Sequence, residues 1–294
     1  MSQKLPSVSI VFPVYNGGNQ PLECIKSITK LNYPKNELET IVVDNNSSDG
    51  SGKRIRDKYK FVKIIINSTN VGFASAVNQA IKQSKGKYVF IANDDLVFEK
   101  NSLKHLILYM LSNPQIGITS GKIFLKSNPK KLSSAGYTMN KWTGNVKSDP
   151  KPNIIKEPDW LQGCALLTTK KILKSVGFLD SEYKHSFEDF DLCLKIRRAG
   201  LKVVYLPKAV FWHGESISAD KNKSFKYYHW YRSKIRFLIK NMPFINILSI
   251  LLLQIFLITP YRAIILRDDR FFPFLKAFFW NLKNLNKTLK AKNI

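Results

Sequence analysis

Short apolar runs alternate with amphipathic stretches through about the first hundred residues of the chain. The runs are rich in β-branched residues and have the length of strands buried on both faces of a parallel sheet. They occupy residues 8–14, 39–43, 62–66 and 88–92. The intervening stretches, which predict helices, are residues 21–31, 52–59 and 74–83. This βαβαβαβ order predicts an α/β fold in which helices flank a mainly parallel sheet.

The pattern becomes less regular further along the chain. Scattered prolines and weak periodicity between Ser112 and Pro158 predict loops and edge strands. The elements expected after them are a strand at 160–168, a helix at 187–199 and closing strands at 201–205 and 209–212. We therefore expect one large α/β domain at residues 1–219.

The chain changes character beyond about residue 220. A basic and aromatic stretch leads into an uncharged apolar run, residues 241–261, which approaches the roughly 20 residues that cross a bilayer. A second apolar and aromatic patch, residues 271–282, is followed by lysines, as suits an anionic membrane interface. We expect residues 220–294 to form a helical, membrane-associating region. Whether residues 241–261 cross the bilayer, lie in it or pack on the domain stays open.

The chain is strongly basic. Its net charge of +26, from 47 Lys and Arg against 21 Asp and Glu, requires an anionic partner or surface. Nucleic acid, anionic lipid and phosphate-bearing substrates all meet that requirement, so charge alone does not choose among them.

Cysteine usage and the N-terminus bear on location. Cys24, Cys164 and Cys193 are widely spaced, which gives no support to a zinc knuckle or a C-x-x-C redox motif and predicts buried thiols in a reducing compartment. The short polar start of the chain lacks an apolar signal segment, so we expect the catalytic domain in the cytoplasm.

Acidic residues follow the fourth predicted strand directly. Ligands of an open α/β sheet bind beyond the carboxyl ends of its strands, which is where Asn93, Asp94 and Asp95 would lie. Hard oxygen ligands of this kind hold Mg²⁺ or Mn²⁺ and leave coordination positions for substrate phosphates. The alternative is an Asp pair that caps the following helix.

Two further polar residues end predicted strands. Asp44 could accept hydrogen bonds from a bound base or ribose, although ordinary turn chemistry explains it equally well. His213 follows the last strand and could add a neutral imidazole to the metal-binding carboxylates, whereas a lone histidine is also commonly structural.

Glu188, Asp189 and Asp191 open the predicted helix 187–199. A carboxylate near a reacting carbon can act as a general base toward an acceptor hydroxyl. Acids in a first helical turn also complement the helix dipole, so this structural explanation stays open beside the catalytic one.

Several enzyme classes lose support. Residues 50–54 contain a Gly-Lys step without the spacing of a P-loop, and no G-x-G-x-x-G follows the first strand. A G-x-S-x-G elbow is also absent from the sequence. These absences argue against a nucleoside triphosphatase, a dinucleotide oxidoreductase and an α/β-hydrolase.

The order of the motifs is more specific than any one of them. Taken together, the segments resemble family 2 glycosyltransferases of the GT-A fold, and the later ones resemble the rhamnosyltransferase-like branch of that family. The segments that carry the resemblance are residues 9–16, 42–51, 70–78, 86–95, 163–167 and 177–193. The likeness spans roughly residues 7–215, so it covers the predicted domain and not the C-terminal region.

The resemblance implies a role for each matching residue. Those expected to bind the donor are Pro13, Tyr15, Asn16 and Asp44 at the nucleoside, and Asn70, Gly72, Asn78 and Asp94 at the ribose, diphosphate and metal. Asp95 would be the principal metal ligand, with Asn93 beside it and His213 completing the site. Asp189 would be the catalytic base, supported by Glu188.

The resemblance also implies a reaction. A sugar would pass with inversion from a UDP- or dTDP-sugar to a hydroxyl of a glycan or lipid-linked acceptor, with Mg²⁺ or Mn²⁺ as cofactor. The triplet reads Asn-Asp-Asp where many members of the branch have Asn-Pro-Asp. Residues 227–233 resemble a Y-x-x-R-N element with Ser233 in the last position, which suggests acceptor diphosphate or lipid binding there.

Two other classes of function stay open. A catalytically silent sugar-binding or scaffold protein would have the same fold and lack turnover. A nucleic-acid-binding protein would explain the basic charge and the aromatic cluster at residues 227–231, but no recognisable nucleic-acid motif is present, so we expect no nucleic-acid partner.

Overall fold

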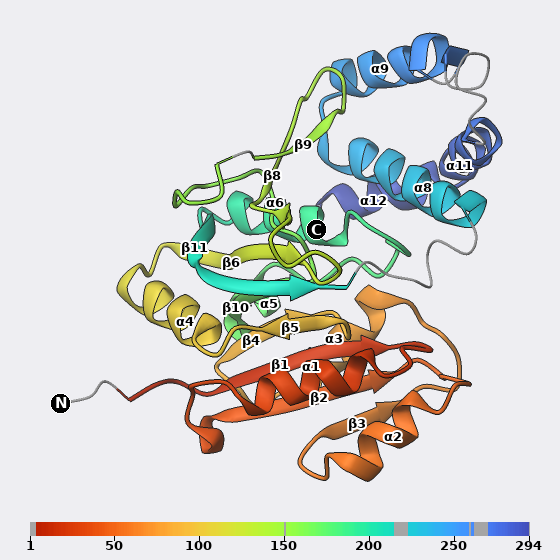
Figure 1. Ribbon diagram of the computed structural model, residues 1–294. Coiled ribbons are helices and arrows are strands. Elements are labelled where there is room, and N and C mark those ends of the chain that lie inside the picture. Colours follow the sequence, from red (N-terminus) through yellow and green to blue (C-terminus); the bar gives the residue numbers. More distant parts are fainter. Residues whose placement is uncertain (1–3, 150, 215–222, 259, 262–269, 294) are drawn as a thin grey trace.

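The computed structural model describes residues 4–149, 151–214, 223–258, 260–261 and 270–293 (Figure 1). Its centre is a nine-stranded mixed sheet in which eight strands follow the order β3-β2-β1-β4-β10-β6-β11-β5, and β7 pairs with β6. The predicted boundary between residues 219 and 220 lies outside the described residues.

The first half of the sheet is parallel, as the apolar pattern predicts. Its strands are β1 (Val8–Val14), β2 (Leu38–Asp44), β3 (Lys63–Ile66) and β4 (Tyr88–Ala92). The helices between them are α1 (Gln20–Thr29), α2 (Ser51–Lys58) and α3 (Phe73–Gln83). The parallel pairs β1 with β2, β1 with β4 and β2 with β3 bring the carboxyl ends of these strands to one edge of the sheet.

The second half of the sheet corrects three predictions. Its strands are β5 (Leu96–Phe98), β6 (Ile116–Leu125), β7 (Leu132–Ser134), β10 (Ala165–Thr169) and β11 (Lys202–His213). Since β10 runs antiparallel to both β4 and β6, the sheet is mixed and the mainly parallel prediction was wrong. The region expected to hold only loops and edge strands contains the long, buried β6, and the two closing strands are one strand with an irregular register between Leu206 and Val210.

Helices cover both faces of the sheet. The remaining elements of this part are α4 (Ser102–Ser112), α5 (Lys170–Ser175), α6 (Glu188–Arg198), and the small hairpin of β8 (Tyr137–Met139) and β9 (Val146–Ser148). Alternate side chains of β1 divide between two apolar cores: Ile10 and Phe12 pack with α1, α2 and α4, whereas Val11 packs with α3, α5 and α6. All three cysteines are buried thiols, as predicted.

The C-terminal region is helical. Its elements are α8 (Lys223–Asn241), α9 (Phe244–Leu253), a π-helical segment (Gln254–Ile258), α11 (Phe271–Lys283), α12 (Leu285–Lys290) and a final 3₁₀ turn (Ala291–Asn293). Helix α8 is part of the main core, because Phe237 and Leu238 pack into the same apolar cluster as α3 and α6. Among the described residues, no helix combines the length and the apolar character that a bilayer crossing needs.

Candidate functional site

The sheet brings together the three residues predicted to bind a metal. Asn93 and Asp95 follow β4 directly, and His213 ends β11, where it pairs with Leu96 of β5. The Oδ1 atom of Asp95 lies 3.1 Å from Nε2 of His213, and the Asn93 amide nitrogen lies 3.0 Å from the same Nε2. His213 is 118 positions from Asp95 and 120 positions from Asn93 in sequence, and the three residues meet at one edge of the sheet.

The donor atoms at this point suit a divalent cation. The Asp95 carboxylate is buried, and its Oδ1 has no hydrogen-bond partner in the described part of the protein. In the tautomer with Nε2 unprotonated, this nitrogen and the Asp95 oxygen face each other without a proton between them, so a cation that takes the place of the Asn93 amide proton at Nε2 would satisfy both. No group of three or more His, Cys, Asp or Glu side chains with metal-binding geometry occurs among the described residues. Mg²⁺ in proteins is usually held by one or two carboxylates together with substrate phosphates, and Asp95 is such a carboxylate.

Asp94 lies beside this pair with a different protonation behaviour. Burial, and then the charge of the neighbouring Asp95 carboxylate, raise the pKa of the Asp94 carboxyl to about 7. The backbone also closes over Asp95, because a Cβ on Gly214 would lie 3.1 Å from Asp95 Cβ and 3.2 Å from its Oδ2. A side chain at position 214 would therefore press on the predicted metal ligand, which would have to shift to make room.

The predicted base lies at the start of α6 on a strained backbone. Ser186 and Phe187 have positive φ angles of 63° and 72° immediately before Glu188 and Asp189. Non-glycine residues in this region cost roughly 1–3 kcal/mol each and tend to occur at functional sites. The Asp189 carboxylate accepts hydrogen bonds of 2.8 Å from the Gly163 and Phe190 backbone N–H groups, which fix its orientation.

Both acids of this pair are hard to ionise. Burial raises the pKa of Asp189 to about 6, against the opposing hydrogen bonds from the Gly163 and Phe190 backbones. Burial, and then the Asp189 charge, raise the pKa of Glu188 still higher, and Glu188 Oε2 is buried without a hydrogen-bond partner in the described structure. The arrangement separates the two carboxyls into a neutral acid and a carboxylate that is available as a base near neutral pH.

Residues 163 and 164 join the metal corner to the base. The N–H of Gly163 donates to Asp189, while the carbonyl of Cys164 accepts the Asn93 N–H at 3.2 Å. The charges of both Asp95 and Asp189 contribute to raising the pKa of the Cys164 thiol, after burial. One peptide segment thus holds both candidate sites close together, just before β10.

The loops after β1 and β2 are braced against each other on the predicted donor side. The Asn16 side-chain oxygen accepts a hydrogen bond from the Ser48 N–H at 2.8 Å, and the backbone N–H of Asn16 donates to the Ser47 hydroxyl at 3.1 Å. Asp44 accepts the Ser47 N–H at 2.9 Å, which is the turn contact that the sequence left as an alternative. The Asn16 and Asp44 side chains therefore hold the backbone of the loop after β2 in place at the strand ends.

The other residues predicted to bind the sugar donor differ in their positions and contacts. Pro13 and Tyr15 lie at the end of β1, where Tyr15 is half exposed, and Asn70 accepts the Gly72 N–H in the loop before α3. Asn78 is separate from these, because both ends of its amide pair with the backbone of Leu179. Its predicted role at the ribose and diphosphate therefore has no support in this geometry.

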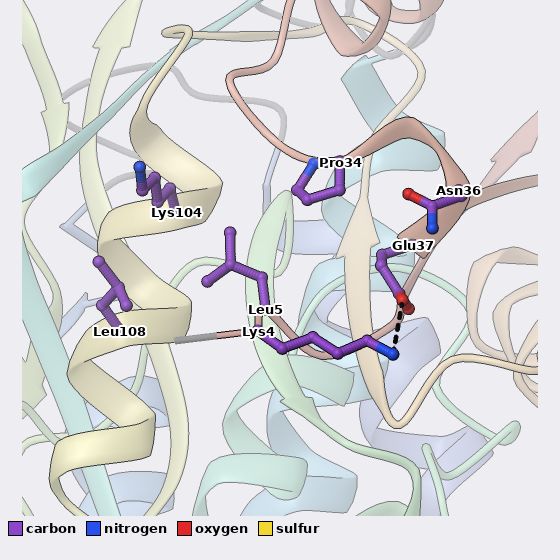
Figure 2. Close-up of a pocket in the computed structure, with 7 residues that line it drawn as sticks. All are labelled: Lys4, Leu5, Pro34, Asn36, Glu37, Lys104 and Leu108. Carbon is purple, nitrogen blue, oxygen red and sulfur yellow. Dashed lines mark ion pairs between the residues drawn. The ribbon is translucent and has the colours of Figure 1, made fainter. Parts of the chain in front are cut away.

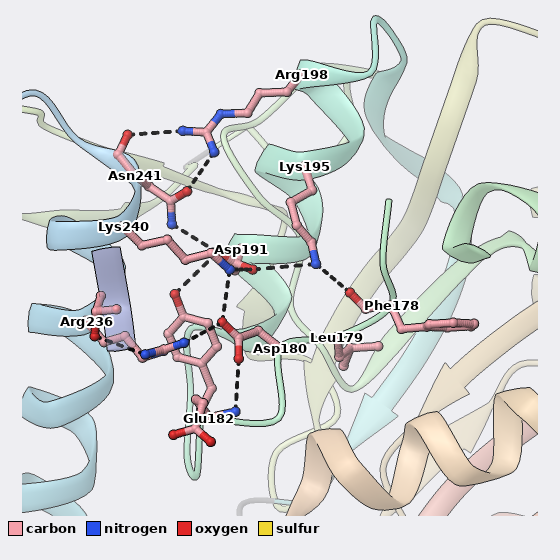
Figure 3. A network of polar contacts seen from close by, with 12 residues as sticks. Phe178, Leu179, Asp180, Glu182, Asp191, Lys195, Arg198, Arg236, Lys240 and Asn241 are labelled. Atoms are coloured by element: carbon pink, nitrogen blue, oxygen red, sulfur yellow. Dashed lines mark hydrogen bonds and ion pairs between the residues drawn. The ribbon is translucent and has the colours of Figure 1, made fainter. Parts of the chain in front are cut away.

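A buried charge network that the sequence did not reveal ties α6 to α8 (Figure 3). Lys240 donates 2.9 Å hydrogen bonds to Asp191 and to Asp180, and Arg236 donates to Asp180 at 2.9 Å. Although burial opposes the effect, Lys240 and Arg236 hold the pKa of Asp180 down at about 2. Asp191 is fully buried two residues after Asp189, on another side of the helix, so this third acid anchors α6 and does not face the strand edge.

A cavity far from this edge can be set aside. It has a volume of about 460 Å³ and lies where Leu5, Pro34 and Leu108 meet, beside the Lys4–Glu37 ion pair (Figure 2). Lys4 precedes β1 and Glu37 precedes β2, so the cavity adjoins the amino ends of the strands. It therefore lies opposite the edge that gathers the candidate site.

Comparison with known proteins agrees with this fold. The family model described as "Glycosyl transferase family 2" matches residues 9–165. Over 226 residues the chain is 25% identical to the probable glycosyltransferase YdaM of Bacillus subtilis, covering 72% of this chain and 52% of that protein. Over 218 residues it is 25% identical to the poly-beta-1,6-N-acetyl-D-glucosamine synthase of Staphylococcus epidermidis, covering 71% and 50%. The chain thus spans about half the length of these curated relatives.

A solved structure is similar in fold. The crystal structure of GalNAc-T7 with UDP, GalNAc and Mn²⁺ superposes with a TM-score of 0.66 at 15% identity, covering 96% of this chain and 58% of that one. The fold is GT-A-like, and the family model and the relatives show that the chain is a glycosyltransferase. Within that class, the chain belongs to glycosyltransferase family 2. The rhamnosyltransferase-like branch stays a prediction.

Proposed function

We propose that the protein is an inverting, metal-dependent glycosyltransferase that moves a sugar from a UDP- or dTDP-sugar to the hydroxyl of a lipid-linked or polysaccharide acceptor. The observation that carries the proposal is the segment Gly163–Cys164, which holds the Asp189 carboxylate and the Asn93 backbone through adjacent residues. A leaving diphosphate and an attacking hydroxyl need their catalytic groups close together, and this segment provides that closeness.

Each candidate residue has a role in this reaction. Asp95, with Asn93 and His213, would hold Mg²⁺ or Mn²⁺, which stabilises charge on a leaving diphosphate when bound. The braced loops at Asn16 and Asp44 would carry the nucleoside, with Pro13 and Tyr15 beside it. Asn70, Gly72 and Asp94 would lie at the ribose and diphosphate.

Asp189 would act on the acceptor. It takes the proton of the acceptor hydroxyl while that oxygen bonds to the anomeric carbon. The bond from the same carbon to the diphosphate oxygen breaks, and the nucleoside diphosphate leaves with the electron pair. Attack from the opposite face inverts the anomeric centre. Glu188, kept neutral by its raised pKa, supports the base without competing for the proton.

The C-terminal helices support a location at an anionic membrane surface, with the catalytic domain on the cytoplasmic side. The polar residues of α9 and its π-helical extension, Asn246 and Gln254, are buried, whereas Phe244, Phe256 and Leu257 are 62–77% exposed. Two side chains of α11, Phe272 and Phe279, are exposed as well. Exposed apolar patches rimmed by basic residues mark interaction surfaces, and an interfacial helix buries such a face among lipid head groups.

Two experiments test the enzymatic part of the proposal, and a third tests the membrane location. Thermal unfolding is measured against UDP-, dTDP- and GDP-sugars with Mn²⁺, since a donor that binds only the folded state raises its apparent stability. Hydrolysis or transfer is then measured for the donor that binds. Donor binding without any turnover would favour the silent sugar-binding alternative, and no binding of any nucleotide sugar would contradict the proposal.

Deletion of residues 241–294 should release the protein from anionic vesicles.

A further inference from the structure

The β8–β9 hairpin is attached to the segment just before β10, in which the Gly163 N–H holds the predicted base. Tyr137 of β8 and Trp160 exchange two backbone hydrogen bonds, with N–O distances of 3.0 and 3.2 Å. Two positions further along β8, the Met139 N–H donates to the Asp159 carboxylate at 2.8 Å. These contacts fix the position of Tyr137 relative to the peptide that orients the base.

The same hairpin contacts the start of α6 through aromatic rings. The Tyr137 ring stacks on Trp160 with centroids 5.0 Å apart, and Trp160 stacks on Phe190 at 4.1 Å. Phe190 directly follows Asp189 at the start of α6. Backbone pairing and ring stacking therefore both fix Tyr137 relative to Asp189.

The polar groups of Tyr137 and Gln162 are only weakly engaged with each other. The phenol oxygen of Tyr137 lies 3.5 Å from Oε1 of Gln162, which is long for an O–H···O hydrogen bond. Both side chains keep part of their surface exposed. A phenol can donate one hydrogen bond and accept others, and the amide of Gln162 carries two N–H donors. The pair can therefore exchange its weak contact for hydrogen bonds to a bound molecule.

The phenol lies within the electrostatic field of the base. Burial raises the pKa of the Tyr137 phenol to about 12, and the charge of Asp189 is a smaller cause in the same direction. A hydrogen bond with the Ser134 side chain opposes the shift. The phenol therefore keeps its proton near neutral pH, and the Gln162 amide is neutral as well. The two residues are suited to binding a hydroxyl group and not to removing its proton.

We propose that Tyr137 and Gln162 select which hydroxyl of the acceptor reacts. They bind the hydroxyl next to the one that Asp189 deprotonates, so the acceptor carries hydroxyls on adjacent carbons of a sugar ring. The inference rests on the proposed glycosyltransferase function and adds two specificity-determining residues to it. Both lie on the side of the base, so they act on the acceptor, whereas the loops after β1 and β2 act on the donor.

Kinetics with defined acceptors test this assignment. The acceptors are the octyl glycosides of glucose, galactose, mannose, rhamnose and N-acetylglucosamine, used with the nucleotide sugar that stabilises the protein against thermal unfolding. NMR of the product identifies the hydroxyl that reacts. The same glycoside is then tested without each of the neighbouring hydroxyls in turn. Loss of one of them should lower kcat/KM for the acceptor about tenfold, the effect of one hydrogen bond.

Variants assign that effect to the two residues. Tyr137→Phe keeps the ring that stacks on Trp160 and removes only the hydroxyl, and Gln162→Met keeps a side chain of similar length. Each should lower kcat/KM for the complete acceptor about tenfold without changing the KM for the donor. Neither should lower it further with the deoxy acceptor, because the contact is already lost. The matched control Tyr59→Phe removes a hydroxyl that donates to the Leu22 carbonyl, and should behave as the wild type does.

The outcomes separate this assignment from the proposed function. Independent, multiplying losses for Tyr137→Phe and the deoxy acceptor, or a parallel loss of donor binding, would overturn the assignment while sugar transfer stands. Donor hydrolysis without transfer to any of the glycosides would overturn a sugar ring as the acceptor. If the wild type neither hydrolyses nor transfers from any nucleotide sugar, the glycosyltransferase function fails and the assignment fails with it.

Discussion

The donor side and the base side of the candidate site are held in different ways. On the donor side, the loops after β1 and β2 are joined by exposed hydrogen bonds such as those of Asn16 with Ser47 and Ser48. On the base side, α6 is anchored by the buried charges of Asp191 and Lys240, which lie 49 residues apart in sequence. The N-terminal part of the chain therefore braces the donor loops, whereas the base depends on α8 for its position.

The largest expected effect is on the base. Asp189→Asn should reduce sugar transfer about 10²–10⁴-fold, the usual contribution of a general base, because the amide cannot take the acceptor proton. Donor binding in the presence of Mn²⁺ should be unchanged. Single-turnover transfer measures the first quantity and calorimetric titration the second. Equal loss of binding and turnover would show that Asp189 belongs to the donor side.

The next effect is on stability. Lys240→Met leaves Asp180 and Asp191 buried without their shared cation and should lower the free energy of unfolding by about 3–5 kcal/mol in urea titrations. Lys287→Met removes an exposed pair with Glu182 and should cost no more than about 1 kcal/mol. On the donor side, Ser47→Ala should also cost about 1 kcal/mol. Similar losses for Lys240→Met and Ser47→Ala would erase the distinction between the two sides.

A matched pair of glycine substitutions separates the metal corner from the base. Gly163→Ala places a Cβ 3.1 Å from Asp189 Cβ, and Gly214→Ala places one at the same distance from Asp95 Cβ. We expect Gly163→Ala to lower kcat and Gly214→Ala to weaken Mn²⁺ affinity, each roughly 10–100-fold, as is typical when supporting contacts of a site are disturbed. Gly163→Ala should leave Mn²⁺ affinity unchanged, and Gly214→Ala should leave kcat at saturating Mn²⁺ unchanged.

The pH dependence gives the smallest effect. Since burial raises the pKa of Asp189 to about 6, kcat/KM should rise with pH through this value as the base ionises. For stability the sign is opposite: a raised folded-state pKa contributes stability that is present below pH 4 and is lost as pH rises through about 6. Asp189→Asn should therefore unfold at a higher temperature than the wild type at pH 8. An acid limb near pH 4 would contradict the buried, hard-to-ionise base.

Sequence pattern predicts the first half of the fold well and the second half poorly. Strands β1 and β4 are continuous apolar runs, which occur in that form when both faces of a strand are buried. The edge strand β3 is also an apolar run, but it is partly exposed and so is not buried on both faces as predicted. The same burial hides strand direction, so β10 could not be recognised as antiparallel from its composition. Buried Thr119 and Ser120 interrupt the apolar character of β6, which is why that strand was not predicted.

In the candidate site, too, some features could be predicted from the sequence and others could not. The sequence predicts that Asp95 and His213 lie together because each comes just after a predicted strand, and strand ends meet at one edge. The anchoring of α6 could not be predicted, because Lys240 lies 60 residues from Asp180 and in sequence resembles a basic residue flanking an apolar run. Only the packing of α8 against α6 shows that its charge is buried and paired.

Metal-dependent donor binding tests the central claim most directly. Calorimetric titration of the best-binding nucleotide sugar is compared for the wild type and Asp95→Ala, each with Mn²⁺ and with a chelator. We predict tight binding only for the wild type with Mn²⁺, and equally weak binding in the other three cases. Donor binding by Asp95→Ala that still responds to Mn²⁺ would show that the metal is held elsewhere, and would contradict the assignment of Asp95, Asn93 and His213.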